Sequence, residues 1–66
     1  MNEYYIELQD AQGTAYGNLD RWGEETTYEV LDEARLAAKS LLKGHIVLTR
    51  IINARTQDVV DFFERG

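Results

Sequence analysis

The sequence predicts an α+β domain in the order β-β-α-β-β, with four mostly antiparallel strands and one helix packed on one face of the sheet. Apolar and polar residues alternate over residues 4–9, one segment has helical spacing of its apolar residues, and the last third is rich in β-branched residues. With 66 residues, the chain is expected to form a single domain over residues 1–66. A chain of this size buries only about 60% of the surface that its unfolded form exposes, so we expect modest stability.

The first two strands are expected to form a hairpin. Residues 4–9 place Tyr4, Ile6 and Leu8 on one face and Tyr5, Glu7 and Gln9 on the other. Asp10 can open a type I turn, and Gly13 can take the positive φ that closes a bulged hairpin. A second strand over residues 14–19 follows. Residues 20–25 show no sustained period, which predicts a loop.

The helix is expected at residues 29–43. Thr26 and Glu29 have the spacing of a capping box, and Gly44 offers a left-handed stop after the helix. The spacings of three and four define one apolar stripe, which comprises Leu31, Ala34, Ala38 and Leu41. This stripe should pack on the sheet against Ile6 and Leu8.

The end of the chain predicts two more strands. Residues 46–52 form the first, and residues 53–58 form a turn. The final segment, residues 59–64, fits a strand or a short helix capped by Thr56. A strand is favoured, because a helix of about eight residues is marginally stable and a hairpin pairs this segment with the neighbouring strand. Both alternating sets of residues 46–52 are apolar, so we expect something to cover the second face of the sheet.

The residue types that carry chemistry are scarce. The chain has no cysteine, which excludes disulfides, thiolate metal ligands and thiol nucleophiles. Ser40 and His45 are the single serine and histidine, and one of each cannot supply a catalytic triad or an imidazole metal cluster. The glycines do not have the spacing of a phosphate-binding loop. We therefore expect a protein that is not an enzyme and that has no catalytic residues, metal site or cofactor.

Charge is divided unevenly along the chain. Residues 1–33 hold nine acids against Arg21, which gives −8, and residues 34–66 hold three acids against six basic residues, which gives +3. The net charge of −5 makes nucleic acid and anionic membranes poor partners and favours a basic protein surface. No apolar run of about 18 residues and no signal-peptide pattern is present, so a cytoplasmic protein is expected.

Aromatic and acidic residues are the candidates for binding a partner. The expected set is Trp22, Glu24, Glu25, Glu29, Asp32, Glu33, Tyr5 and Tyr16. Trp22 fits two interpretations, of which a cover for the core edge is favoured over an anchor in an interface. The acids near residue 29 also complement the positive end of the helix dipole. An alternative site is the row Arg35, Lys39 and Lys43, which could bind an anion or nucleic acid, although a solvated helix face is favoured.

The order of these segments resembles small proteins of phages and mobile elements. A hairpin precedes the alanine-rich stretch Leu31-Asp32-Glu33-Ala34-Arg35-Leu36-Ala37-Ala38, and Arg50-Ile51-Ile52-Asn53-Ala54-Arg55-Thr56 precedes a Val-Val strand. Some anti-CRISPR proteins have this size and organisation. The resemblance implies a stoichiometric inhibitor that occupies a surface of a host protein in the host cytoplasm. A homodimer formed through the uncovered sheet face or an edge strand is a further alternative.

Overall fold

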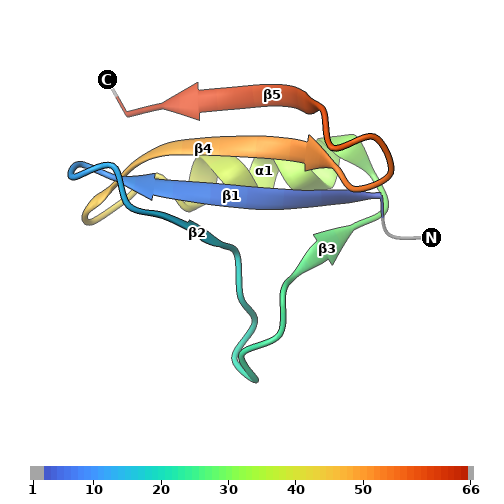
Figure 1. Ribbon diagram of the computed structural model, residues 1–66, viewed down its shortest axis with the longest axis horizontal. Helices are drawn as coiled ribbons and strands as arrows, with labels where there is room; N and C mark the ends of the chain where they lie inside the picture. The colour runs from blue at the N-terminus through green and yellow to red at the C-terminus, as the bar shows by residue number, and fades with distance from the viewer. Residues whose placement is uncertain (1–2, 66) are drawn as a thin grey trace.

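A computed structural model describes residues 3–65 and gives one helix packed on an antiparallel five-stranded sheet (Figure 1). The elements are β1 (Tyr4–Asp10), β2 (Ala15–Gly17), β3 (Thr27–Tyr28), α1 (Leu31–Ser40), β4 (Ile46–Asn53) and β5 (Val59–Glu64). The sheet order is β2-β1-β4-β5, and β3 also pairs with β1. The expected α+β class is confirmed, including the assignment of residues 59–64 to a strand.

The centre of the sheet is the long antiparallel pair of β1 and β4. Ile6 lies opposite Ile51 and Leu8 lies opposite Thr49, so these side chains share the face that α1 covers. The turn from β1 to β2 forms as the sequence predicts: the Gly13 amide donates to the Asp10 carbonyl, and Gly13 has a φ of 89°. Only glycine adopts such a φ without steric cost.

The helix approaches the sheet through its alanines. Ala34 and Ala38 are fully buried, and their small side chains let the backbone of α1 come close to β4. The buried Thr49 hydroxyl accordingly donates to the Ala38 carbonyl across 3.2 Å. Leu31 and Leu41 pack at the border of this core. The predicted apolar stripe is therefore confirmed.

The helix is shorter than predicted at both ends. It begins after Val30, whose side chain makes no capping hydrogen bond, so the capping box of Thr26 and Glu29 is wrong. The Thr26 amide donates to the Asn18 carbonyl at 2.7 Å, and residues 27–28 form β3, because pairing with β1 satisfies this backbone better than a helical turn would. At the other end, Gly44 does have a positive φ of 61°, but it lies in the turn that leads into β4.

The second predicted strand is also too long, and a fifth strand was not anticipated. β2 ends at Gly17, although residues 14–19 were expected to be extended in one strand. Leu19 makes only an isolated bridge with Glu25. The two-residue strand β3 then pairs with the beginning of β1, at Tyr4 and Tyr5.

Replacing Ile51 by alanine should destabilise the fold strongly, because this side chain is fully buried between α1 and β1. Loss of a buried isoleucine costs about 2–5 kcal/mol, and each kcal/mol lowers Tm by roughly 4–8 °C in a domain of this size. Thermal unfolding followed by circular dichroism measures the effect. Leu36→Ala is the matched control, because Leu36 is 70% exposed on the outer side of α1. Equal melting temperatures for the two variants would contradict this core.

Candidate protein-binding loop

Two short strands share one edge of β1, and the chain between them leaves the sheet. β2 pairs with residues 7–9 of β1, whereas β3 pairs with residues 4–5. Residues 18–26 connect the two strands and cannot lie on the same edge, so they project from it as a hairpin-like loop (Figure 1). We call residues 18–26 the projecting loop.

The base of the projecting loop is fixed to the sheet by hydrogen bonds. The Asn18 amide donates to the Ile6 carbonyl at 2.9 Å, and the Asn18 carbonyl accepts from the Thr26 amide at 2.7 Å. The buried Asn18 side chain donates through Nδ2 to the Tyr28 hydroxyl at 2.7 Å. The two arms of the loop therefore leave the sheet at a defined spacing.

Asp20 organises the tip of the loop. Its Oδ1 accepts hydrogen bonds from the backbone amides of Trp22 (2.8 Å) and Glu24 (3.0 Å). The Asp20 backbone also bonds to Gly23 and Glu24, and Gly23 has a φ of 85°. An aspartate that caps its own turn in this way fixes the backbone locally. The tip is thus a closed turn with defined geometry.

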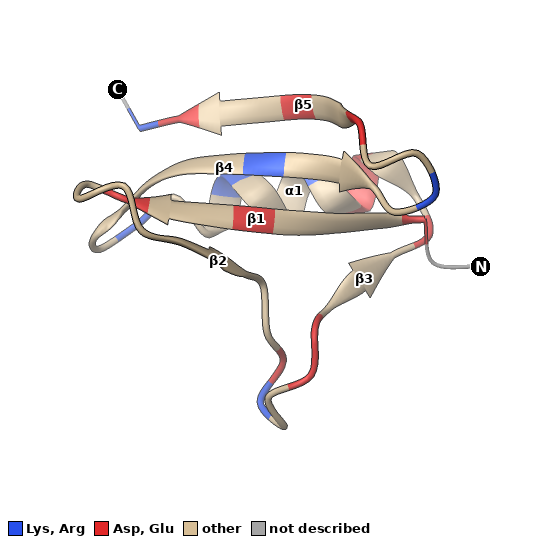
Figure 2. Ribbon diagram, viewed as in Figure 1, with Lys and Arg blue, Asp and Glu red and all other residues tan. Residues whose placement is uncertain are grey.

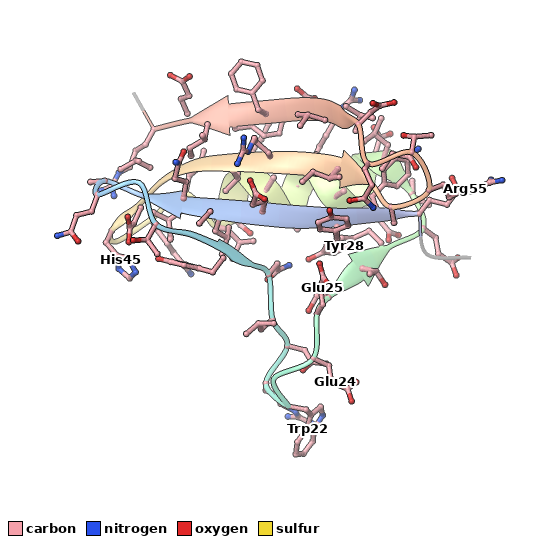
Figure 3. The ribbon with its side chains drawn as sticks, viewed as in Figure 1. Trp22, Glu24, Glu25, Tyr28, His45 and Arg55 are labelled. Atoms are coloured by element: carbon pink, nitrogen blue, oxygen red, sulfur yellow. The ribbon has the colours of Figure 1, made fainter. Side chains whose placement is uncertain are left out.

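Trp22 is the outermost large side chain of the projecting loop (Figure 3). It is 76% exposed, so the favoured interpretation of Trp22 as a cover for the core is wrong. The Arg21 guanidinium lies 4.9 Å from the centre of the indole ring, which is within cation–π range. Leu19, on the same loop, is 59% exposed. The loop therefore presents apolar surface to solvent.

Carboxylates flank this apolar tip. Glu24 and Glu25 follow it on the returning arm, and both are exposed (Figure 3). Together with Asp20 they give the projecting loop three acids against Arg21. The Asp20 carboxylate accepts hydrogen bonds from amides of the turn, whereas neither glutamate forms an ion pair with any described residue. Of the predicted binding residues, Trp22, Glu24 and Glu25 thus lie on this one loop.

The other predicted binding residues lie elsewhere. Glu29, Asp32 and Glu33 are exposed at the start of α1, where Asp32 contacts Arg35 at 3.3 Å. Tyr5 points to the sheet face opposite α1, and its hydroxyl donates to Gln57 Oε1 at 3.0 Å. These residues therefore do not form one surface with the projecting loop.

Tyr16 belongs to the helix side of the sheet. It lies opposite Leu8 in the β1–β2 pair, packs against the core, and has its ring 6.5 Å from the His45 ring. Partial desolvation, and to a smaller extent the Asp10 carboxylate, raises the pKa of the Tyr16 phenol. The phenol thus stays protonated at neutral pH, and Tyr16 serves packing here.

The charge division along the sequence is partly neutralised in space, because acidic β1 lies beside β4 with its basic residue (Figure 2). Basic residues of the second half contact acids of the first: Arg50 meets Glu7, Arg55 meets Glu3 at 3.4 Å, and Arg35 meets Asp32. Asp10, like Asp20, accepts hydrogen bonds from the amides of its own turn. The excess negative charge is therefore concentrated at the projecting loop and the start of α1.

The basic helix row is engaged within the chain. Arg35 Nε donates to Asp61 Oδ2 at 2.9 Å, and the Lys39 ammonium lies 5.4 Å from the centre of the Phe63 ring. Lys43 lies beyond the end of α1. These three side chains thus do not present one free cationic row to an anion.

Residues 3–65 contain no group of three or more metal-ligating side chains and enclose no pocket. Its helix is neither long nor apolar enough to span a membrane. The whole chain matches no protein-family model, no curated protein and no solved structure.

Sequence reasoning missed two residues of the projecting loop. Leu19 was assigned to a strand, and Asp20 was treated as an ordinary loop residue. The signal for Asp20 was present, because an aspartate three residues before a glycine is typical of a side-chain-capped turn. The exposure of Leu19 depends on where β2 leaves β1, which no local pattern specifies.

Removing the Asp20 carboxylate should loosen the tip without unfolding the protein. In Asp20→Ala the amides of Trp22 and Glu24 lose their acceptor, so their hydrogen exchange should accelerate, while the amides of β1 and β4 keep their protection. Asp20→Asn retains a side-chain oxygen and is the control. Unchanged exchange at both loop amides in Asp20→Ala would show that other contacts hold the tip.

Proposed function

We propose that this chain is a noncatalytic protein-binding module that docks through the projecting loop. Trp22 is the anchor, and Glu24 and Glu25 engage basic groups at the rim of the partner's site. The observation that carries the proposal is a 76% exposed tryptophan on a turn whose backbone is already fixed. Tryptophan and arginine are enriched among the residues that dominate binding energies, and Arg21 and Trp22 stand together at this tip.

The ordered backbone of the loop supports an anchoring role. A flexible loop loses conformational entropy when it binds, whereas a preorganised one keeps more of its contact energy as affinity. Asp20 at the tip and Asn18 at the base supply this order before any partner arrives. The partner that fits is a protein with an apolar pocket bordered by lysine or arginine.

Electrostatics favour a basic partner. The whole chain carries −5, and the projecting loop holds three acids against one arginine, so a positive surface would be attracted over a Debye length of about 8 Å at physiological ionic strength. If the partner is a host protein whose basic surface normally holds nucleic acid, the glutamates would take the place of phosphates. That is the inhibitor version of the proposal, in the host cytoplasm.

Trp22→Ala should weaken partner binding by roughly 30-fold or more, since truncating such an anchor costs about 2 kcal/mol or more. The loss should appear mainly as faster dissociation. The experiment immobilises the wild-type chain and the variant, identifies by mass spectrometry the extract proteins retained only by the wild type, and measures both chains against the purified partner. The thermal transition of Trp22→Ala should be unchanged, because Trp22 lies in solvent. Equal affinity of both chains for every purified candidate would remove the anchor from the proposal.

Glu24→Lys should slow association with the same partner and reduce its dependence on salt. Glu33→Lys makes the same change in net charge at the start of α1 and is the matched control. A loop-specific effect requires Glu24→Lys to be the more damaging variant. Equal effects would assign the acidic contribution to overall charge, and tight binding of the wild type to duplex DNA or RNA at physiological salt would support the nucleic-acid alternative instead.

A further inference from the structure

The sheet face opposite α1 carries an apolar surface with no element of the described chain over it. In the view of Figure 1 the helix lies behind the sheet, so this open face points toward the reader. The strand registers place on it Tyr5, Glu7 and Gln9 of β1, Leu48, Arg50 and Ile52 of β4, and Phe62 and Glu64 of β5, with Val59 opposite Ile52 at a register shift. Ile52 is buried there without belonging to the helix-side core, and Phe62 is 56% exposed. We call this surface the open face.

One ion pair occupies the middle of the open face. Glu7 and Arg50 lie opposite each other on β1 and β4, and the Glu7 carboxylate contacts Arg50 Nη2. Glu7 Oε1 and Arg50 Nε are buried and make no hydrogen bond of good geometry within residues 3–65. Leu48, Ile52 and Phe62 border the pair, whose side chains are 36% (Arg50) and 30% (Glu7) exposed, so a second pair of opposite orientation would find both charges accessible.

We propose that a second copy of this chain covers the open face, in a face-to-face sheet dimer whose two-fold axis runs along the strands between β1 and β4. Such an axis places β1 of each copy over β4 of the other. Glu7 then lies over Arg50 of the second copy, and Arg50 over Glu7 of the second copy. One contact thus extends the two ion pairs into a four-charge cluster of alternating sign.

The remaining side chains are complementary under the same axis. Tyr5 falls over Ile52 of the second copy, which pairs an aromatic with an aliphatic side chain. The row that runs across the sheet is Gly17, Glu7, Arg50 and Phe62. Its reversal puts Phe62 over Gly17 of the second copy, where there is no side chain. The nearest atom to a Cβ placed at Gly17 is Glu25 Oε1 at 3.8 Å, so no backbone atom crowds this position and the Glu25 side chain would border the incoming ring. Aligned sheets pack in this way about 10 Å apart.

Net charge also selects this face. Two copies that each carry −5 repel one another wherever acidic surfaces meet. On the open face the charges of Glu7 and Arg50 cancel within each copy. Glu64, opposite Leu48, remains as an acid on β5, and the two-fold axis keeps the Glu64 residues of the two copies on opposite edges of the contact. The two-fold axis directs the tips of the projecting loops to opposite edges of the dimer, and only Glu25 at the base of each loop borders the contact, beside Gly17.

The free edge of β5 is a poorer contact for a second copy. The Phe62 amide on this edge strand already donates to Asp61 Oδ1 at 2.9 Å, and Asp61 Oδ2 binds Arg35. A ladder with another strand would have to break that amide contact. We therefore place the dimer contact on the face and not on the edge.

Sedimentation equilibrium of the wild-type chain should give twice the mass of one chain at high concentration and a reversible decrease on dilution. Phe62→Glu should raise the dimer dissociation constant tenfold or more. Leu36→Glu makes the same substitution at an exposed apolar residue on the other side of the molecule and should leave the constant unchanged. Trp22→Ala should also dimerise normally, which separates this contact from the projecting loop. A wild-type chain that stays monomeric, or a folded Phe62→Glu variant that dimerises as well as Leu36→Glu, would overturn the proposal.

Charge exchange tests the orientation of the two copies. Glu7→Arg alone and Arg50→Glu alone each place like charges opposite one another in a homodimer, so each should be mainly monomeric. A mixture of the two variants restores opposite charges across the contact and should form a heterodimer. Homodimers of both variants that are as stable as the wild type would overturn the proposed axis and support edge pairing. If either variant does not fold, the comparison of Phe62→Glu with Leu36→Glu decides the proposal alone.

Discussion

The outer edge of β1 is shared by two short strands, and the rest of the molecule's shape depends on that sharing. A seven-residue strand offers one row of backbone donors and acceptors on this side, and β2 and β3 occupy adjacent parts of it. Chain that connects two strands on one edge has no place in the sheet and must leave it. Projection of residues 18–26 is therefore a consequence of backbone pairing, and a rigid sheet holds the base of the loop that carries Trp22.

The small number of helices also explains why one face of the sheet is open. Within residues 3–65 the sheet has five strands, and one ten-residue helix is present to cover them. Ala34 and Ala38 bring that helix close to β4, which makes a dense core from few side chains. Within residues 3–65 no second helix covers the opposite face, so Tyr5, Leu48 and Phe62 stand at a surface that self-association would bury.

Local patterns predicted the elements that local physics controls. Alternation identified β1, helical spacing identified the buried alanines, and Asp10 with Gly13 identified the first turn. The wrong boundaries lie where a distant strand competes for the backbone. Thr26 has the residue type and spacing of a helix cap, yet its amide bonds to Asn18, because β3 pairs with β1 some twenty residues earlier in the sequence. A capping box is a local sequence pattern, so it cannot indicate that a distant strand will pair with the same backbone.

The pairing of charges could not be predicted from the sequence either, because it depends on which strands lie side by side. A count along the chain suggests one acidic and one basic half, but antiparallel pairing of β1 with β4 brings residues from both halves into contact. Glu7 meets Arg50 because Ile6 must lie opposite Ile51 in the core, so the register of the core decides which charges are neutralised. Glu24 and Glu25 escape this neutralisation because their loop has left the sheet and no strand lies opposite them. Glu24 and Glu25 are thus acids that sheet topology excludes from pairing, and they lie on the same loop as the tryptophan that this topology leaves in solvent.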